Sequence, residues 1–281
     1  LYFGKFYQSG KLAVTLDVPL KIPFYWEPIA AWNKYDYFRN RTSIIDEIQP
    51  PFVVTEEFFV GNSFGLPFVL KSLFRIDYKY FQEEYSYFSN RDFDIADTAD
   101  VSRFTGHTLG FTIQKFNQDF KQYPSSGTQF CLDGRLITGL EETSYSMSSG
   151  EVMKTQNSQT WVAFSFKLNT FPVESRYYSL GLDVQANASN MPNFSNYWAT
   201  IISFNAYQPN PEAVTLFQPN FRSRNWFGVG ITNVFKPLKK LQLRLDGYLF
   251  QPIVQIFEGN DGGIRESDLL EFNYYIFAAS I

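Results

Sequence analysis

Hydrophobic and polar residues alternate along most of the chain with a period of two. This is the period of a β-strand whose two faces have different surroundings. The pattern predicts about a dozen strands, and no long stripe of helical period competes with it. The clearest runs cover residues 11–18, 74–80, 162–168, 178–188 and 241–249.

The breaks between these runs alternate between short and long. We expect tight connections at residues 61–67 and 171–175, and long ones at residues 39–51, 141–157 and 190–222. A soluble β-sandwich has no reason to keep its long loops at one end. A bacterial outer-membrane β-barrel does, because its turns are short on the periplasmic side and its loops long on the other.

Aromatic residues are far above ordinary usage, with 31 Phe, 18 Tyr and 5 Trp in 281 residues. Many lie near the ends of the alternating runs, as the girdles of a membrane barrel would at the lipid–water boundary. Many of the runs are also close to the roughly 9 to 11 residues with which a tilted strand crosses a bilayer. The same alternation would suit a sandwich core, which is the competing interpretation of the fold.

Charge and rare residues exclude several classes of protein. With 24 Lys and Arg against 28 Asp and Glu, the net charge is −4 and there is no basic patch for nucleic acid. One Cys and one His exclude a disulfide framework within the chain and a Cys/His zinc site. No apolar run reaches the roughly 18 to 20 residues of a membrane-spanning helix. Because the chain begins at Leu1, we expect it to be part of a longer protein.

Four candidate chemical sites have simpler explanations. Ser63 lies in a G-x-S-x-G pattern, but the residues after it read as a strand and not as the helix of a hydrolase elbow. His107 shares the phase of an apolar strand face, and Cys131 is expected to be a small residue facing the lumen. The acidic residues between Asp92 and Asp100 could offer oxygens to Ca²⁺, but they lack the spacing of an EF-hand and fit a solvated loop.

The segment YPSSGT at residues 123–128 resembles the Y/F-P-T-x-G turn of the bacterial surface antigen superfamily of outer-membrane assembly and translocation barrels. Tyr123, Pro124 and Gly127 match that periplasmic turn motif, and Ser125 stands where Thr is usual. The wider sequence is similar to the C-terminal barrels of patatin-like phospholipase proteins of Bacteroidota. The matching segments are FYQSG at 6–10, KIPFY at 21–25, ADTAD at 96–100, TLFQPNFR at 215–222 and LRLDGYLF at 243–250.

The resemblance implies a 16-stranded transmembrane antiparallel β-barrel, about 12 strands of which lie in this chain, with two before it and two after it. It also implies that a loop containing Phe221 and Arg222 folds back into the lumen, and that strands follow from residues 225, 240 and 268. Ser223 replaces the Gly of the superfamily's R-G-F/Y pattern. By phase, we expect Arg222 to pair with Asp246, since a buried cation needs a carboxylate partner. Residues 194–207 would belong to the loop, where the spacing of aromatic and apolar residues suits a short helix.

We therefore expect residues 1–281 to form a single, incomplete barrel domain in a bacterial outer membrane, in contact with its lipid and lipopolysaccharide. The resemblance places a patatin-like lipid acyl hydrolase and a periplasmic domain upstream, so this segment is expected to have no catalytic, cofactor or metal residues of its own. It would anchor or translocate the attached module, or act as a subunit with other outer-membrane or periplasmic proteins. The alternatives are a passive diffusion pore, which conductance would distinguish, and a secreted all-β binding module. Cargo and oligomeric state are left open.

Overall fold

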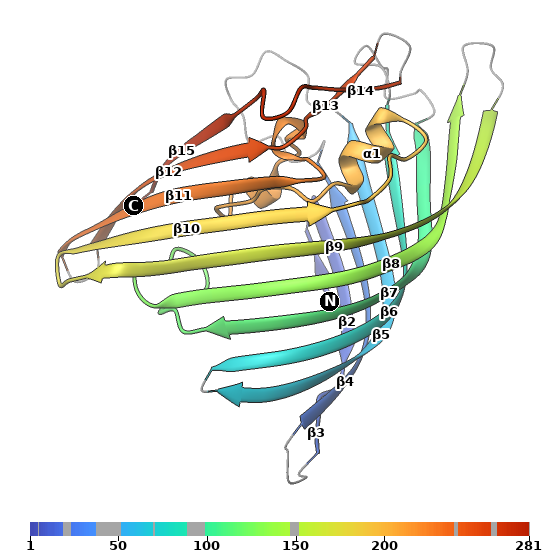
Figure 1. Ribbon diagram of the computed structural model, residues 1–281. Coiled ribbons are helices and arrows are strands. Elements are labelled where there is room, and N and C mark those ends of the chain that lie inside the picture. The colour runs from blue at the N-terminus through green and yellow to red at the C-terminus, as the bar shows by residue number, and fades with distance from the viewer. Residues whose placement is uncertain are drawn as a thin grey trace.

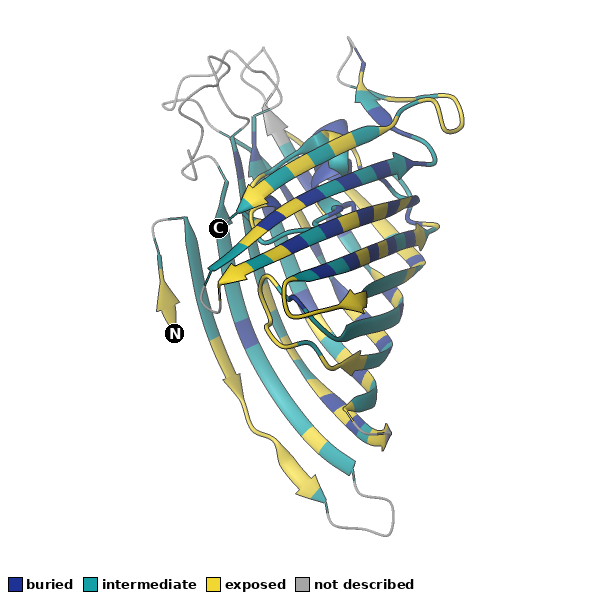
Figure 2. Ribbon diagram, turned by 90° about the vertical axis from the view of Figure 1, so that its left-hand side faces the viewer, coloured by how far each residue is buried: buried dark blue, intermediate teal, exposed yellow. Residues whose placement is uncertain are grey.

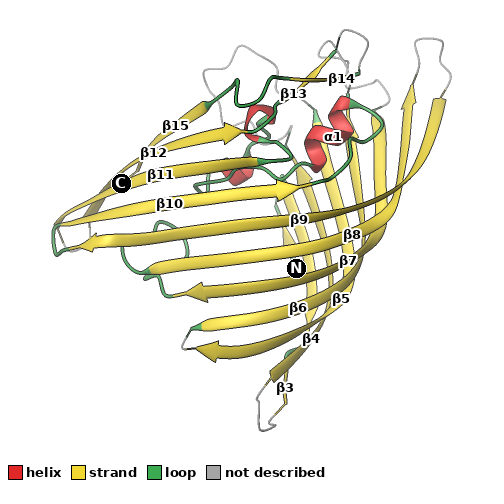
Figure 3. Ribbon diagram, in the orientation of Figure 1, coloured by secondary structure: helices red, strands yellow, loops and turns green. Residues whose placement is uncertain are grey.

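A computed structural model describes residues 1–4, 6–18, 24–37, 52–69, 71–88, 99–146, 152–238, 241–259 and 263–280. Its dominant feature is one antiparallel sheet of 13 strands, whose order follows the chain from β1 to β12 and ends with β15, while β3 pairs with β4 off this path. The sheet curves around a short helix, α1 (Tyr197–Ser203), as Figures 1 and 3 show.

The strands of the sheet are long and are joined as a simple meander. Their bounds are β1 (Tyr2–Phe3), β2 (Tyr7–Ala13), β3 (Leu16–Val18), β4 (Phe24–Asp36), β5 (Val53–Val69), β6 (Ser72–Tyr87), β7 (Asp100–Phe116), β8 (Thr128–Ser146), β9 (Val152–Glu174), β10 (Tyr178–Ser189), β11 (Trp226–Leu238), β12 (Leu241–Pro252) and β15 (Tyr274–Ser280). A separate hairpin pairs β13 (Ile256–Glu258) with β14 (Ile264–Glu266).

The two ends of the sheet carry different connections. At one end, the turn end, β9 joins β10 through residues 175–177. At the other, the helix end, the chain between β10 and β11 covers residues 190–225, and that between β12 and β15 covers 253–273. The predicted asymmetry of loop length is thus present. Two connections depart from it: the turn of residues 117–127 between β7 and β8 is longer than its neighbours at the turn end, and residues 147–151 between β8 and β9 are a short connection at the helix end.

Two predicted connections are wrong, the tight one predicted at 171–175 lies at 175–177 because β9 extends to Glu174, and a predicted strand starts late. Residues 61–67 lie inside β5, and the predicted long break at 141–157 is mostly strand, because β8 extends to Ser146 and β9 begins at Val152. The strand expected from residue 268 begins at Tyr274, whereas those expected from 225 and 240 are confirmed as β11 and β12. The break predicted at 39–51 lies outside the described residues.

The two faces of the sheet have opposite character. On the convex face, alternate positions of β6, β10, β11 and β12 expose large apolar side chains, which produces the striped burial pattern of Figure 2. On the concave face the positions between them are buried and mostly polar. Those with charged or amide groups include Asp77, Asp183, Gln185, Asn187, Arg244 and Asp246. This is the reverse of a β-sandwich, where the apolar faces would pack against each other.

Among the described residues, the two apolar clusters inside the curve lie at the helix end and beside it. The larger cluster joins α1 to wall residues such as Phe81, Phe104 and Trp161. The smaller one contains Tyr207, Trp226, Tyr248 and Phe250. The fold is therefore all-β and barrel-like, as predicted, with one sheet around an interior of its own chain, although the first and last strands of the sheet are not paired with each other.

The 117–127 turn depends on Gly127, whose φ of +85° lies in the left-handed region. A Cβ at this position would meet the carbonyl oxygen of Asn117 at 2.0 Å. We therefore expect Gly127→Ala to lower the free energy of unfolding by at least about 1 kcal/mol, measured by urea titration. Gly247→Ala is the matched control, because its Cβ would lie 3.5 Å from Phe277, an ordinary contact. An equal loss in both variants would contradict the argument.

Candidate functional site

The interior of the curved sheet is the candidate site, and it is occupied by residues 190–225, here called the inner segment. This segment contains α1 and two 3-10 turns, η1 (Ala213–Thr215) and η2 (Pro219–Phe221). Asn196 caps α1, since its side-chain oxygen accepts a hydrogen bond from the backbone N of Ala199 at 2.8 Å. The short helix expected within residues 194–207 is thus confirmed.

Aromatic packing holds the start of the inner segment against the wall. The Phe194 ring stacks on Phe104 of β7 with centroids 5.6 Å apart, and lies edge-on to Trp161 of β9 at 6.3 Å. Within α1, Ala199 and Ile201 are completely buried. Burying aliphatic and aromatic side chains of this size contributes about 1.5 to 3 kcal/mol each, so the helix is a fixed part of the interior.

A buried polar network ties the same region to three wall strands. Glu141 of β8 is 0% exposed, and its carboxylate accepts hydrogen bonds from the backbone N of Ser195 at 2.7 Å and from the Thr143 hydroxyl at 3.1 Å. The Thr143 and Ser102 hydroxyls are 3.0 Å apart. Because a carboxylate here would be costly without donors, the network fixes where the inner segment begins.

Tyr87 of β6 closes this network on the far side. Its hydroxyl lies 2.9 Å from that of Ser102 and accepts a hydrogen bond from the Asn196 side-chain amide at 2.6 Å. The residue that caps α1 therefore also binds the wall. The sequence offered only a weak signal for this network, because its members look like ordinary inward positions near strand ends.

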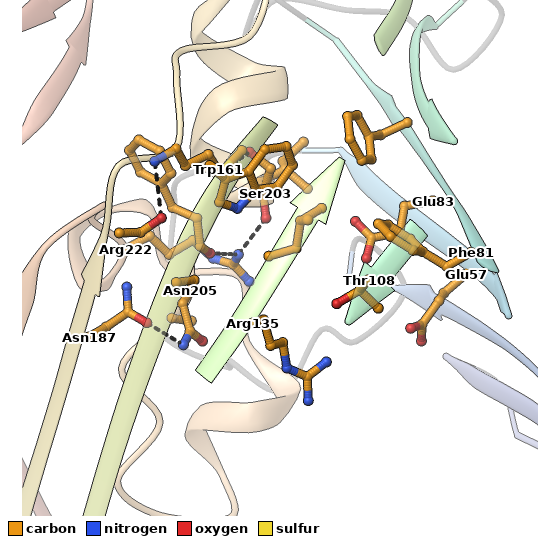
Figure 4. Close-up of a pocket in the computed structure, with 18 of the residues that line it drawn as sticks. Glu57, Phe81, Glu83, Thr108, Arg135, Trp161, Asn187, Ser203, Asn205 and Arg222 are labelled. Atoms are coloured by element: carbon orange, nitrogen blue, oxygen red, sulfur yellow. Dashed lines mark hydrogen bonds between the residues drawn. The ribbon is translucent and has the colours of Figure 1, made fainter. Parts of the chain in front are cut away.

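Arg222 lies inside the barrel, 7% exposed, at the end of η2. One of its terminal nitrogens donates to the carbonyl oxygens of Ile202 at 2.7 Å and Phe204 at 2.9 Å, as Figure 4 illustrates. Its guanidinium also lies 4.7 Å from the ring centroid of Phe217. A cation at the C-terminal carbonyls of a helix is favourable, so Arg222 stabilises the end of α1. Burial lowers the pKa of this guanidinium, which nonetheless stays protonated.

The predicted pairing of Arg222 with Asp246 is wrong. Asp246 accepts hydrogen bonds from Arg244, two residues earlier on the inward face of β12, at 2.9 and 3.0 Å. The alternation along the strand correctly placed Asp246 on the inward face, but the cation that pairs with it, Arg244, is on the same strand. The Phe221 ring packs on those of Phe250 and Tyr274, with centroids 5.6 Å apart in each pair.

Arg244 connects the wall to the 117–127 turn, which contains the Tyr123, Pro124 and Gly127 motif. It donates to the carbonyl oxygen of Pro124 at 2.8 Å and lies 5.8 Å from the ring centroid of Tyr123. The Tyr123 hydroxyl in turn donates to the carboxylate of Glu212 in the inner segment. The turn therefore folds toward the interior and meets the inner segment from the opposite end of the barrel.

Between the wall and the inner segment lies a chamber of about 530 Å³. Figure 4 shows Glu57, Glu83 and Thr108 of the wall on one side and Asn187, Asn205 and Arg222 on the other, with Arg135 between them. The lining carboxylates already have donors in the wall: Asn33 donates to Glu57, Tyr85 to Glu83, and Arg135 to Asp133.

The other candidates from sequence lie outside this chamber. Ser63 is buried within β5, which runs on through it with no turn or helix, so the geometry of a hydrolase elbow is absent there. His107 is exposed on the convex face of β7, with its Nδ1 2.8 Å from the Tyr78 hydroxyl. Cys131 is a half-buried free thiol on β8, in phase with Asp133. Most of the acidic stretch from Asp92 to Asp100 lies outside the described residues.

The described part of the chain contains no group of three or more His, Cys, Asp or Glu side chains that could hold a metal ion. Nor does it contain a helix long and apolar enough to cross a membrane. Comparison of the chain with protein-family models and with curated proteins finds no match.

Glu141 offers a direct test of how the inner segment is held. Glu141→Gln replaces a carboxylate oxygen by a donor facing the Ser195 N–H, so we expect a loss of about 1 to 3 kcal/mol and faster exchange of the α1 amides. Hydrogen–deuterium exchange with mass spectrometry measures both. Glu142→Gln is the matched control, because this neighbour faces outward and makes only a 3.4 Å contact with Gln156. Unchanged α1 exchange in the Glu141 variant would show that the network does not hold the segment.

Asp119 gives the 117–127 turn a pH dependence. Burial alone would raise the pKa of its carboxyl group, but hydrogen bonds from Ser125, Ser126 and Phe120 outweigh burial and lower the pKa below its ordinary value. A lowered folded pKa means that the stabilisation is complete above the unfolded pKa of about 3.9 and is lost as pH falls through the folded value. We expect the Ser125 and Ser126 amides to lose protection only in that acidic range, and Asp119→Asn to lack this transition when exchange is followed against pH.

Proposed function

We propose that the chain is the wall and plug of an integral outer-membrane β-barrel. In this role it anchors or translocates an attached module, or acts as a subunit of an outer-membrane complex. The resemblance noted above makes a patatin-like phospholipase the proposed module, located upstream of this segment. No catalytic role is proposed for the segment itself.

The observation that carries the proposal is the apolar convex face. Val184, Val229 and Leu245 are among many large apolar side chains at least about a third exposed on alternate strand positions. Monomeric soluble proteins rarely expose contiguous apolar patches beyond about 300 to 600 Å². Lipid hydrocarbon around the sheet accounts for such a face. Hydrocarbon cannot hydrogen-bond to the backbone, so every backbone polar group must be paired within the sheet, and the long continuous pairing of β7, β8 and β9 allows this.

The contents of the lumen support a plugged barrel over a passive diffusion pore. The inner segment crosses the interior at the helix end, and the 117–127 turn meets it from the turn end through Tyr123 and Glu212. A porin needs a continuous water-filled channel. Here the apolar packing of α1 and the Glu141 network would both have to break before such a channel opened.

The proposal also requires partners for the free edges of the sheet. The outer edge of β15 and the edge beside β1 and β2 are not paired with each other. Lipid cannot hydrogen-bond to these backbone groups, so in a membrane the edges must be covered by further strands. We propose that these strands belong to a longer form of the same protein or to another chain.

A pair of neighbouring substitutions tests whether the convex face meets hydrocarbon. Val184 is 36% exposed on the convex face of β10, and Gln185 is 7% exposed on the concave face, where its amide donates to Asp183 at 2.9 Å. In a bilayer, Val184→Arg should cost about 2 to 4 kcal/mol and reduce the folded yield, whereas Gln185→Arg places its charge in the lumen near a carboxylate.

The measurement is refolding into lipid vesicles, followed by the gel-mobility difference between heated and unheated samples. In a soluble binding module the ranking would reverse, because an exposed Val tolerates Arg and a buried Gln does not. Equal or better folding of the Val184 variant would therefore contradict a membrane location.

A further inference from the structure

Arg222 is a buried cation without a carboxylate partner among the described residues. Other arginines on the concave face have one: Arg135 pairs with Asp133 at 2.7 Å and Arg244 with Asp246 at 2.9 Å. Arg222 instead contacts two carbonyl oxygens, the Tyr37 side chain and the ring of Phe217, none of which carries a net charge. Burying a cation without a counter-charge is costly, so its place beside a chamber calls for an explanation.

The unpartnered polar atoms around the chamber have a common character. Among its described lining residues, the buried side-chain atoms without a hydrogen-bond partner are the Nε of Arg222, the Nε of Arg224 and the Oγ1 of Thr108. The two arginine Nε–H groups can only donate hydrogen bonds, and the threonine hydroxyl can donate one as well as accept. The lining acids Glu57, Glu83 and Asp133 already accept hydrogen bonds from protein groups. The Arg224 guanidinium has the Glu266 carboxylate at 3.7 Å, so on the side of the inner segment Arg222 is the cation without a counter-charge, and the unpartnered donors there lack acceptors.

We propose that this chamber binds a small molecule carrying an oxyanion, with Arg222 as its charge partner and with the Nε of Arg224 and the hydroxyl of Thr108 as further donors. Guanidinium groups suit phosphate, sulfate and carboxylate because their N–H groups match the spacing of two oxygens. A volume of about 530 Å³ is larger than a single ion needs, so the ligand has a polar body beyond its oxyanion. Asn187 and Asn205, which share a hydrogen bond of 3.0 Å, lie beside Arg222 to meet that body.

The site goes beyond the proposed membrane role and does not depend on what surrounds the convex face. The ligand site can therefore be disproved while the membrane role holds, and the membrane role can be disproved while the ligand site holds. A neutral water molecule could satisfy the unpartnered donors but would leave the charge of Arg222 uncompensated. For this reason the inference points to an anion.

The test is isothermal titration of the natural, full-length protein in detergent micelles at constant ionic strength. The probes are inorganic phosphate, glucose 6-phosphate and glucose. We expect saturable binding of glucose 6-phosphate, weaker binding of phosphate and none of glucose. Arg222→Gln should weaken glucose 6-phosphate binding at least about tenfold, and Arg222→Lys should have a smaller effect, because it keeps the charge but loses the fork.

The matched control is Arg103→Gln, which removes an exposed arginine of β7 that pairs with Glu84 away from the chamber and should bind as the unaltered protein does. Because Arg222 also stabilises α1, its variants could fail to fold. Thr108→Val and Arg224→Gln then carry the test, with an expected weakening of about threefold or more each. No saturable binding by the unaltered protein, or unchanged affinity in the folded chamber variants, would overturn the proposal.

Discussion

The structure depends on one constraint: a single curved sheet presents its apolar side chains outward and its polar side chains inward. A sheet of this kind cannot stabilise itself by packing two apolar layers together, as a sandwich does. Its concave face must instead find polar partners, and it finds them in its own chain. The inner segment of residues 190–225 and the 117–127 turn enter the interior from opposite ends and meet at Tyr123 and Glu212.

Different interactions hold the inner segment in place at the two ends of α1. At the start, an acid of the wall, Glu141, accepts from the backbone of Ser195, while aromatic rings exclude water. At the end, the cation of Arg222 compensates carbonyl groups that the helix leaves without partners. The first fastening joins the segment to the wall, and the second joins the segment to itself.

The period-two pattern predicted the sheet well, because side-chain direction in a strand depends only on the position along it. The pattern failed at a glycine, because glycine occurs both in turns and at places where two strands approach closely. Gly61 suggested a turn, but it lies within β5, where a Cβ would meet the carbonyl oxygen of Tyr78 at 2.5 Å, so the glycine permits a close approach of strands. The helix in residues 197–203 was predictable because its period differs from its surroundings. The Glu141 network was not, since it depends on which distant strands become neighbours.

The error over Asp246 shows why phase cannot assign ion pairs in a barrel. Residues two apart on one strand always share a face, so a cation and an acid at such spacing can pair regardless of the rest of the fold. Arg135 with Asp133 and Arg244 with Asp246 both do so. These local pairs occupy Asp133 and Asp246, so neither acid is left for a cation of the inner segment. Arg222 is not supplied with an acid by this spacing, and its hydrogen bonds go to the neutral carbonyl oxygens of Ile202 and Phe204 beside the chamber.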